Sequence, residues 1–139
     1  MPNHYHLLVK QLEDKGISEF INKVFNSYTK YFNTKHNRVG PLLQGQFKAI
    51  RIGYDEQFIH VSRYIHLNPI TSFLVRDLRD YPWSSYQDFI GLRKDKLCNK
   101  SPIMSFFKSS KKYEEFVLDQ VKYGQSLEII KHLAIDYDN

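Results

Sequence analysis

The sequence predicts an α+β fold in which two short strands accompany several helices. Residues 3–10 and residues 47–52 alternate between the two faces of a chain, as half-buried strands do. Residues 18–35 instead repeat apolar side chains at steps of three and four, which is typical of an amphipathic helix. With 139 residues and a hydrophobic content of 42%, the chain can form one domain with a small appendage.

The first predicted strand carries two histidines on the same face. Side chains alternate across a strand, so His4 and His6 project to one side, and Tyr5 and Leu7 project to the other. Two neighbouring imidazoles can bind one divalent metal ion. A lone His-x-His pair is weak evidence, because such pairs arise by chance, and it needs support from a second segment.

The first helix is expected to begin at Ser18, whose hydroxyl can cap it, and to run to about residue 35. We expect it to pack one broad apolar face, formed by Ile17, Phe20, Ile21, Val24, Phe25, Tyr28, Tyr31 and Phe32. Residues 37–45 form a loop broken at Gly40-Pro41, and the second strand follows at residues 47–52.

A second helix is predicted over residues 56–67, with Asp55 as its cap and Asn68-Pro69 as its end. Residues 80–86 turn into a short helix that stops near Gly91. Residues 93–100 are charged and resemble a linker. Three further helices are expected to begin at Ser101-Pro102, at residue 113 and at residue 126.

The helix at residues 56–67 supplies the second segment of a candidate site. His60, Tyr64 and Asn68 are spaced by four residues, so they share one face with about 6 Å between neighbours. Tyr64 is a candidate nucleophile, and the Asn68 amide oxygen is a candidate third metal ligand beside His4 and His6. A mixed nitrogen and oxygen site with open positions suits Mg²⁺ or Mn²⁺, although nitrogen ligands also suit Zn²⁺.

The charge distribution favours a nucleic-acid partner. The formal net charge is +5, and no acidic residue occurs between Glu19 and Asp55. Basic side chains neutralise phosphates, and interleaved aromatic rings can stack on unpaired bases. The alternative is a solvated basic face over core aromatics, which we favour for Phe25, Tyr28 and Phe32. The candidate DNA-binding residues are Lys23, Lys30, Lys35, Arg38, Lys48, Arg51 and Arg63.

Other sequence features limit where the protein works. No apolar run approaches the ~20 residues of a membrane span, and no signal peptide is visible. Cys98 is the single cysteine, so an internal disulfide is impossible. These features predict a cytoplasmic protein without a membrane partner.

Four ordered blocks resemble one known family. Residues 1–9 resemble the HUH motif (histidine, bulky hydrophobic residue, histidine) of single-tyrosine transposases. Residues 40–48, 62–69 and 81–86 resemble blocks of the REP-associated tyrosine transposases, a branch of the insertion-sequence-200-like family. The resemblance covers about residues 1–92.

This resemblance implies a ferredoxin-like or RRM-like catalytic domain over residues 1–92, with an antiparallel sheet, followed by a helical extension over residues 93–139. It implies metal-dependent cleavage and rejoining of single-stranded or hairpin DNA through a 5′-phosphotyrosine. By position, His4 and His6 match the metal-binding histidines, Tyr64 the nucleophile and Asn68 the amide ligand. His66 points away from the face of Tyr64 and receives no catalytic role, whereas His60 is a candidate helper of Tyr64.

Family members carry a strand, a helix and another strand before the histidine strand, so we expect an N-terminally truncated chain with an incomplete sheet. A second hypothesis follows, in which the protein binds hairpin nucleic acid but no longer cleaves it. The sequence also leaves open whether Tyr64 meets the histidines of its own chain or those of a second copy in a homodimer.

Overall fold

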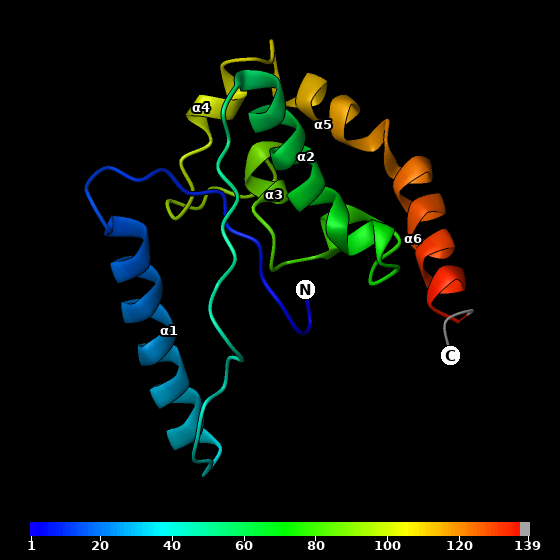
Figure 1. Cartoon of the computed structure of the whole chain (residues 1–139). Coiled ribbons are helices and arrows are strands. Elements are labelled where there is room, and N and C mark those ends of the chain that lie inside the picture. Colours follow the sequence, from blue (N-terminus) through cyan, green and yellow to red (C-terminus); the bar gives the residue numbers. More distant parts are fainter. Residues whose placement is uncertain (137–139) are drawn as a thin grey trace. The chain divides into compact units, whose positions relative to one another are not determined.

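The structure, a computed structural model, describes residues 1–136, with side chains to residue 130. The chain divides into two compact units. Unit 1 combines residues 1–7 with residues 52–139, and unit 2 comprises residues 8–51. Helix α1 belongs to unit 2 (Figure 1). The helices of unit 1 are α2 (Asp55–Thr71), the 3₁₀ helix η1 (Leu78–Asp80), α3 (Tyr86–Phe89), α4 (Ser101–Met104), α5 (Ser110–Leu118) and α6 (Val121–Asp136).

Helix α1 spans Gly16–Lys35, close to the predicted range, but its start and its burial differ from the prediction. Lys15 precedes the helix in a left-handed conformation with φ of 57°, and Ser18 lies within the first turn instead of capping it. Of the predicted apolar face, only Ile21 is buried, and Tyr28 is 48% exposed. The prediction that this face packs broadly against a core is therefore wrong.

Helix α2 extends four residues beyond its predicted end, so the prediction that Asn68-Pro69 terminates it is wrong. Pro69 removes one backbone donor, but it is followed by a turn that satisfies the last carbonyl groups. The backbone N–H of Ser72 donates to the Asn68 carbonyl, and the Gln125 side chain of α6 donates to the Ile70 carbonyl. The Pro69 ring itself is fully buried, so packing favours keeping it inside the helix.

The core of unit 1 forms where α2 meets α3, α5 and α6. Figure 1 shows α5 and α6 following α2 along its length. The short helices after residue 80 contribute buried apolar side chains to this core, among them Phe89 of α3, Ile103 of α4 and Val117 of α5. The largest fully buried side chains are Tyr86, Tyr113, Leu78, Val117 and Pro69.

A polar network runs through this core beneath α2. The Tyr113 hydroxyl lies 2.6 Å from Ser62 Oγ and 2.8 Å from His66 Nδ1, and His66 Nε2 lies 2.9 Å from Ser85 Oγ. His66 is only 3% exposed. Burial lowers the pKa of His66 to about 4, although the nearby Asp88 carboxylate opposes this shift. His66 is therefore a neutral side chain packed inside the core.

The segment expected to be a linker is anchored to α3. Arg93 donates from Nε and Nη2 to the carboxylate of Asp88, which is 4% exposed, and Lys100 donates to the Asp88 carbonyl. This bidentate pair holds the pKa of Asp88 below its usual value. Arg93 also donates to the carbonyls of Pro82 and Ser84, so one guanidinium fixes the chain on both sides of Trp83.

The predicted α+β class is wrong, because the described residues contain helices but no strand or sheet. Residues 3–10 and 47–52 are irregular, and none of their described backbone groups enters a hydrogen-bonded ladder. Alternation of side chains makes a segment suitable for a strand, but a strand exists only when a neighbouring segment pairs with it. The ferredoxin-like sheet is therefore absent from residues 1–136.

The lengths and hydropathy of the helices test whether any of them could cross a membrane. Among the described helices, none combines the length and the apolar character needed to cross a membrane.

Candidate active site

The two N-terminal histidines lie side by side. The ring centroids of His4 and His6 are 5.0 Å apart, and the rings are nearly perpendicular. His4 Nδ1 lies 2.7 Å from the side-chain oxygen of Asn3. Because that oxygen only accepts, Nδ1 donates, and in the neutral form of this ring Nε2 has the lone pair. Burial lowers the pKa of His6, and His4 and the charged N-terminus lower it further.

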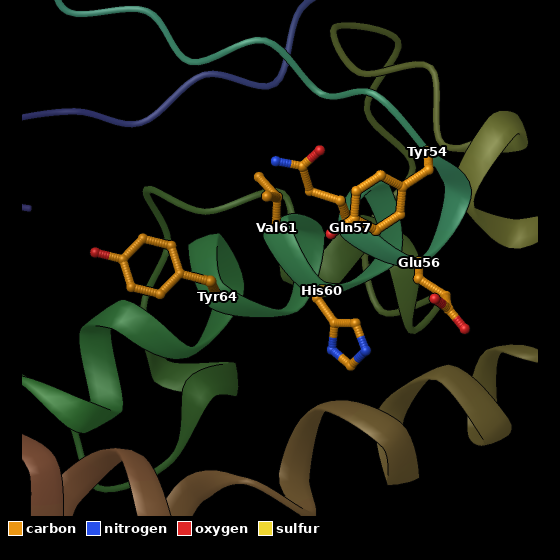
Figure 2. Close-up of a pocket in the computed structure, with 6 residues that line it drawn as sticks. All are labelled: Tyr54, Glu56, Gln57, His60, Val61 and Tyr64. Carbon is orange, nitrogen blue, oxygen red and sulfur yellow. The ribbon is translucent and has the colours of Figure 1, made fainter.

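Tyr64 lies against this histidine pair, on α2. The ring centroids of His6 and Tyr64 are 5.5 Å apart in an edge-to-face arrangement. The Tyr64 ring is 57% exposed, and its hydroxyl points away from the helix (Figure 2). Both histidines and Tyr64 belong to unit 1, so one chain brings these three side chains together.

Asn68 lies one turn beyond Tyr64 and is 8% exposed. Its amide nitrogen donates to the Tyr64 carbonyl at 3.2 Å. This bond occupies the nitrogen and leaves the oxygen as the atom available to a ligand. The hydrogen bond of Asn68 joins it to the backbone of the predicted nucleophile and not to either histidine.

His60 and Arg63 interact with each other instead of with Tyr64. Arg63 Nη2 lies 2.7 Å from His60 Nδ1, and since a guanidinium only donates, this imidazole nitrogen accepts. The guanidinium also lies 4.3 Å from the centroid of the Phe116 ring. Figure 2 shows the His60 ring directed away from the Tyr64 hydroxyl. Arg63 thus joins α2 to α5, and His60 has no lone pair that faces Tyr64.

A groove of about 400 Å³ follows α2 from its first turn to Tyr64. Its lining residues are Tyr54, Glu56, Gln57, His60, Val61 and Tyr64 (Figure 2). The Gln57 oxygen accepts from the backbone N–H of Gly53 at 2.8 Å, which fixes this side chain across the helix start. Sequence reasoning missed Tyr54 and Gln57, although the spacing of seven residues between Gln57 and Tyr64 places Gln57 on the same helical face.

Six of the seven predicted DNA-binding residues lie in unit 2 and are exposed. Three of them have local partners: Lys23 pairs with Glu19, the Lys35 ammonium lies over the Tyr31 ring, and Arg38 donates to Asn33. The remaining three, all exposed, are Lys30, Lys48 and Arg51. Within unit 2, α1 carries a shallow hollow lined by Ser27, Lys30, Tyr31, Thr34 and Lys35. The seventh predicted residue, Arg63, is directed to Phe116 as described above.

The donor set of the histidine pair fits a metal ion only in part. Within the described residues, no group of three or more His, Cys, Asp or Glu side chains is arranged to hold a metal. The rings of His4 and His6, with centroids 5.0 Å apart, are two of the predicted donors, and the Asn68 oxygen is the third. The bond from His4 Nδ1 to Asn3 is the kind of outer contact that orients a metal-binding imidazole.

Comparison with known proteins bears on this arrangement. Residues 1–68 match the model of a protein family described as "Transposase IS200 like". No curated protein and no solved structure matches the chain. The matched range includes both histidines, Tyr64 and Asn68. The match covers just under half of the chain, and over that range the sequence is similar to IS200-like transposases.

Proposed function

We propose that this protein is a single-tyrosine transposase of the REP-associated branch, which cleaves and rejoins single-stranded or hairpin DNA. The observation that carries the proposal is the cluster of His4, His6 and Tyr64 in one chain, with 5.5 Å between the His6 and Tyr64 rings. A tyrosine of the core would be buried, whereas this one is 57% exposed, and its ring lies against that of His6. The family match to residues 1–68 supports the same assignment.

A divalent ion, Mg²⁺ or Mn²⁺, is the cofactor that we assign to the pair His4 and His6, with Asn68 as the oxygen donor. When bound, such an ion polarises a phosphate and offsets its developing charge. The pairing of His4 with Asn3 leaves Nε2 free for this purpose. The hydrogen bond from Asn68 to the Tyr64 carbonyl ties the third donor to the nucleophile's own turn of helix.

The covalent step belongs to Tyr64. Its phenolic oxygen attacks the scissile phosphorus, the new O–P bond forms, and the bond from phosphorus to the 3′ oxygen breaks. The tyrosine proton leaves, and the departing 3′ oxygen gains a proton. The product is a 5′-phosphotyrosine and a free 3′-hydroxyl, and reversal of the step rejoins strands without ATP. The exposed hydroxyl of Tyr64 is accessible to a strand without rearrangement of the core.

The basic and aromatic surface of unit 2 is assigned to backbone binding. Lys30 and Lys35 flank Tyr31 in the hollow on α1. Their ammonium groups can pair with phosphates, and the tyrosine ring can stack on a base. Transposition requires access to DNA, and a single free cysteine, Cys98, suits the cytoplasm, which is where we place the protein.

The competing function is a hairpin-binding module without cleavage. The absence of a sheet from the described residues favours it, because residues 3–10 have no ladder to hold the histidines in place. This module would keep the DNA-binding surface of unit 2 and would form no covalent adduct.

Replacement of Tyr64 by phenylalanine distinguishes the two functions. We expect wild-type protein with Mn²⁺ and labelled hairpin DNA to give a protein–DNA adduct on a denaturing gel. Tyr64→Phe should abolish the adduct, because it removes the attacking oxygen, while the affinity for DNA changes less than about twofold.

The matched control is Tyr123→Phe, since the ring of Tyr123 on α6 is 62% exposed. This variant should form the adduct at the wild-type rate. Binding without any adduct, across several hairpins and metals, would instead establish the binding module. Loss of binding in Tyr64→Phe would count against the role assigned to this hydroxyl.

A further inference from the structure

We propose, on the basis of the function above, that the groove beside Tyr64 binds a nucleobase of the strand next to the cleaved phosphate. This groove is a site that neither the histidine pair nor the basic surface of unit 2 accounts for. It lies within unit 1, and Tyr64 is one of its lining residues, so it is adjacent to a phosphate that reaches the nucleophile.

The lining residues form one continuous face along α2. Tyr54, Gln57, Val61 and Tyr64 follow one another at steps of three or four residues, which places them in a row. Ten residues of helix separate the first from the last, or about 15 Å. The groove therefore extends from the nucleophile over more than the length of one nucleotide.

The chemistry of this row matches a base better than a phosphate. The lining contains no lysine or arginine, and Glu56 at its edge is a carboxylate that repels phosphate oxygens. The sugar–phosphate backbone is thus expected to remain outside the groove. The uncharged flat part of a nucleotide, its base, is the part that can enter.

Each side chain of the row offers a contact that a base requires. The ring of Tyr54 is 65% exposed and provides a stacking surface, and Val61 is a half-buried apolar wall. The Gln57 oxygen accepts from Gly53, so the two N–H groups of its amide nitrogen remain as donors to an acceptor on the base edge. His60 is held by Arg63 through Nδ1, which leaves Nε2 as a donor at the rim.

The test measures DNA binding separately from cleavage. All proteins carry Tyr64→Phe, so that no covalent capture occurs, and fluorescein-labelled single-stranded oligonucleotides with randomised sequence serve as the probe in anisotropy titrations. We expect Tyr54→Ala to weaken binding about tenfold, and Tyr54→Phe to retain it, because stacking needs the ring and not the hydroxyl. Tyr123→Ala, which removes an equally exposed ring from α6, should bind as the parent protein does.

A second arm identifies the base. A single abasic site is moved along a hairpin oligonucleotide, on both sides of the loop junction, and binding is measured for the parent and for Tyr54→Ala. At one position the abasic site should weaken binding of the parent about tenfold and have no further effect in Tyr54→Ala, since both changes remove the same contact.

Equal affinity of Tyr54→Ala and the parent would overturn the proposal, and so would an abasic penalty that is unchanged in Tyr54→Ala. Failure of the cleavage function has a different signature, because protein with Tyr64 intact would then form no adduct while Tyr54→Ala still lost affinity. That result would keep the groove as a base-binding site of a non-cleaving module.

Discussion

Unit 1 buries several of its aromatic residues in a core, whereas no aromatic residue of unit 2 is buried. Tyr86 and Tyr113 are 1% and 0% exposed, while Tyr28 and Tyr31 of α1 are 48% and 59% exposed. Unit 2 contributes a single buried hydrophobic residue, Ile21, and the other described core residues belong to unit 1. Buried apolar surface therefore stabilises the fold of unit 1 far more than that of unit 2.

This difference also separates the two kinds of functional residue. Tyr64 lies on α2, a helix that packs against the core of unit 1, and such a position suits chemistry that depends on placement. The basic residues of α1 lie on a unit with little core of its own, where exposed rings and cations are available to a strand. Aromatic content alone did not distinguish these uses, because both units contain several aromatic residues.

The contrast in burial between the two units is tested by replacing one tyrosine with alanine in each of them. Tyr113→Ala should lower the free energy of unfolding by about 4 kcal/mol, because it leaves a cavity and removes the partner of Ser62 and His66. Tyr28→Ala should change it by less than about 0.5 kcal/mol. Urea denaturation followed by circular dichroism measures both, and similar losses in the two variants would refute the contrast between the units.

The sequence predicted the helices well and the sheet wrongly, for a physical reason. Periodicity at Phe20, Val24 and Tyr28 reports a helix that forms within its own segment, and α1 is present. The alternation around His4 and His6 describes half of a structure whose other half is a pairing partner. Burial likewise depends on what covers a face, so the apolar row of α1 identified a helix but not a core.

The candidate site was predictable where residues of one helix or one short segment define it. The spacing of Tyr64 and Asn68 gives one helical face directly, and the structure adds the bond between them. The position of His6 against Tyr64 followed only from the family resemblance, because 57 residues intervene. The role of Arg63 was not accessible, since its partner Phe116 lies on α5, and no local signal links the two.

The second prediction uses the buried imidazole of unit 1. His66 has a pKa of about 4 in the folded chain and about 6.5 when unfolded, so the unfolded chain binds more protons between these values. The contribution of neutral His66 to the free energy of unfolding is fully present above pH 6.5. It is lost as the pH falls towards 4, by up to about 3 kcal/mol. Asp88 stays ionised over this window, because Arg93 holds its pKa below the usual value.

Urea denaturation at intervals of half a pH unit from pH 4 to pH 7.5 measures the slope of the free energy of unfolding against pH. His66→Gln should flatten it, because no proton is then taken up at this position on unfolding. His36→Gln is the control from unit 2, where the side chain is exposed, and its slope should equal that of wild type. An unchanged slope in His66→Gln would show that another group carries the pH dependence.

The smallest predicted effect concerns the contact between α2 and α6 beneath Asn68. A Cβ added at Gly124 would lie 2.5 Å from Cγ2 of Thr71, which is closer than two such atoms can approach. Thr71 cannot turn freely, because its hydroxyl donates to the carbonyls of Leu67 and Asn68. The steric cost of Gly124→Ala, about 2 kcal/mol, exceeds the gain of about 1 kcal/mol from replacing glycine in a helix. We therefore expect a net loss of about 1 kcal/mol in thermal or urea denaturation.

Two further variants test whether Thr71 is the reason that Gly124→Ala destabilises the protein. Gly53→Ala, where the added Cβ meets nothing within 4 Å, should change stability by less than about 0.5 kcal/mol. In a background of Thr71→Ser, which keeps the hydroxyl and removes Cγ2, the same Gly124→Ala change should stabilise the protein by up to about 1 kcal/mol, because only the helix propensity remains. A loss of equal size in both backgrounds would mean that Thr71 is not what requires glycine at this position. The end of α2 would then owe its place to other contacts of α6, such as the bond from Gln125 to Ile70.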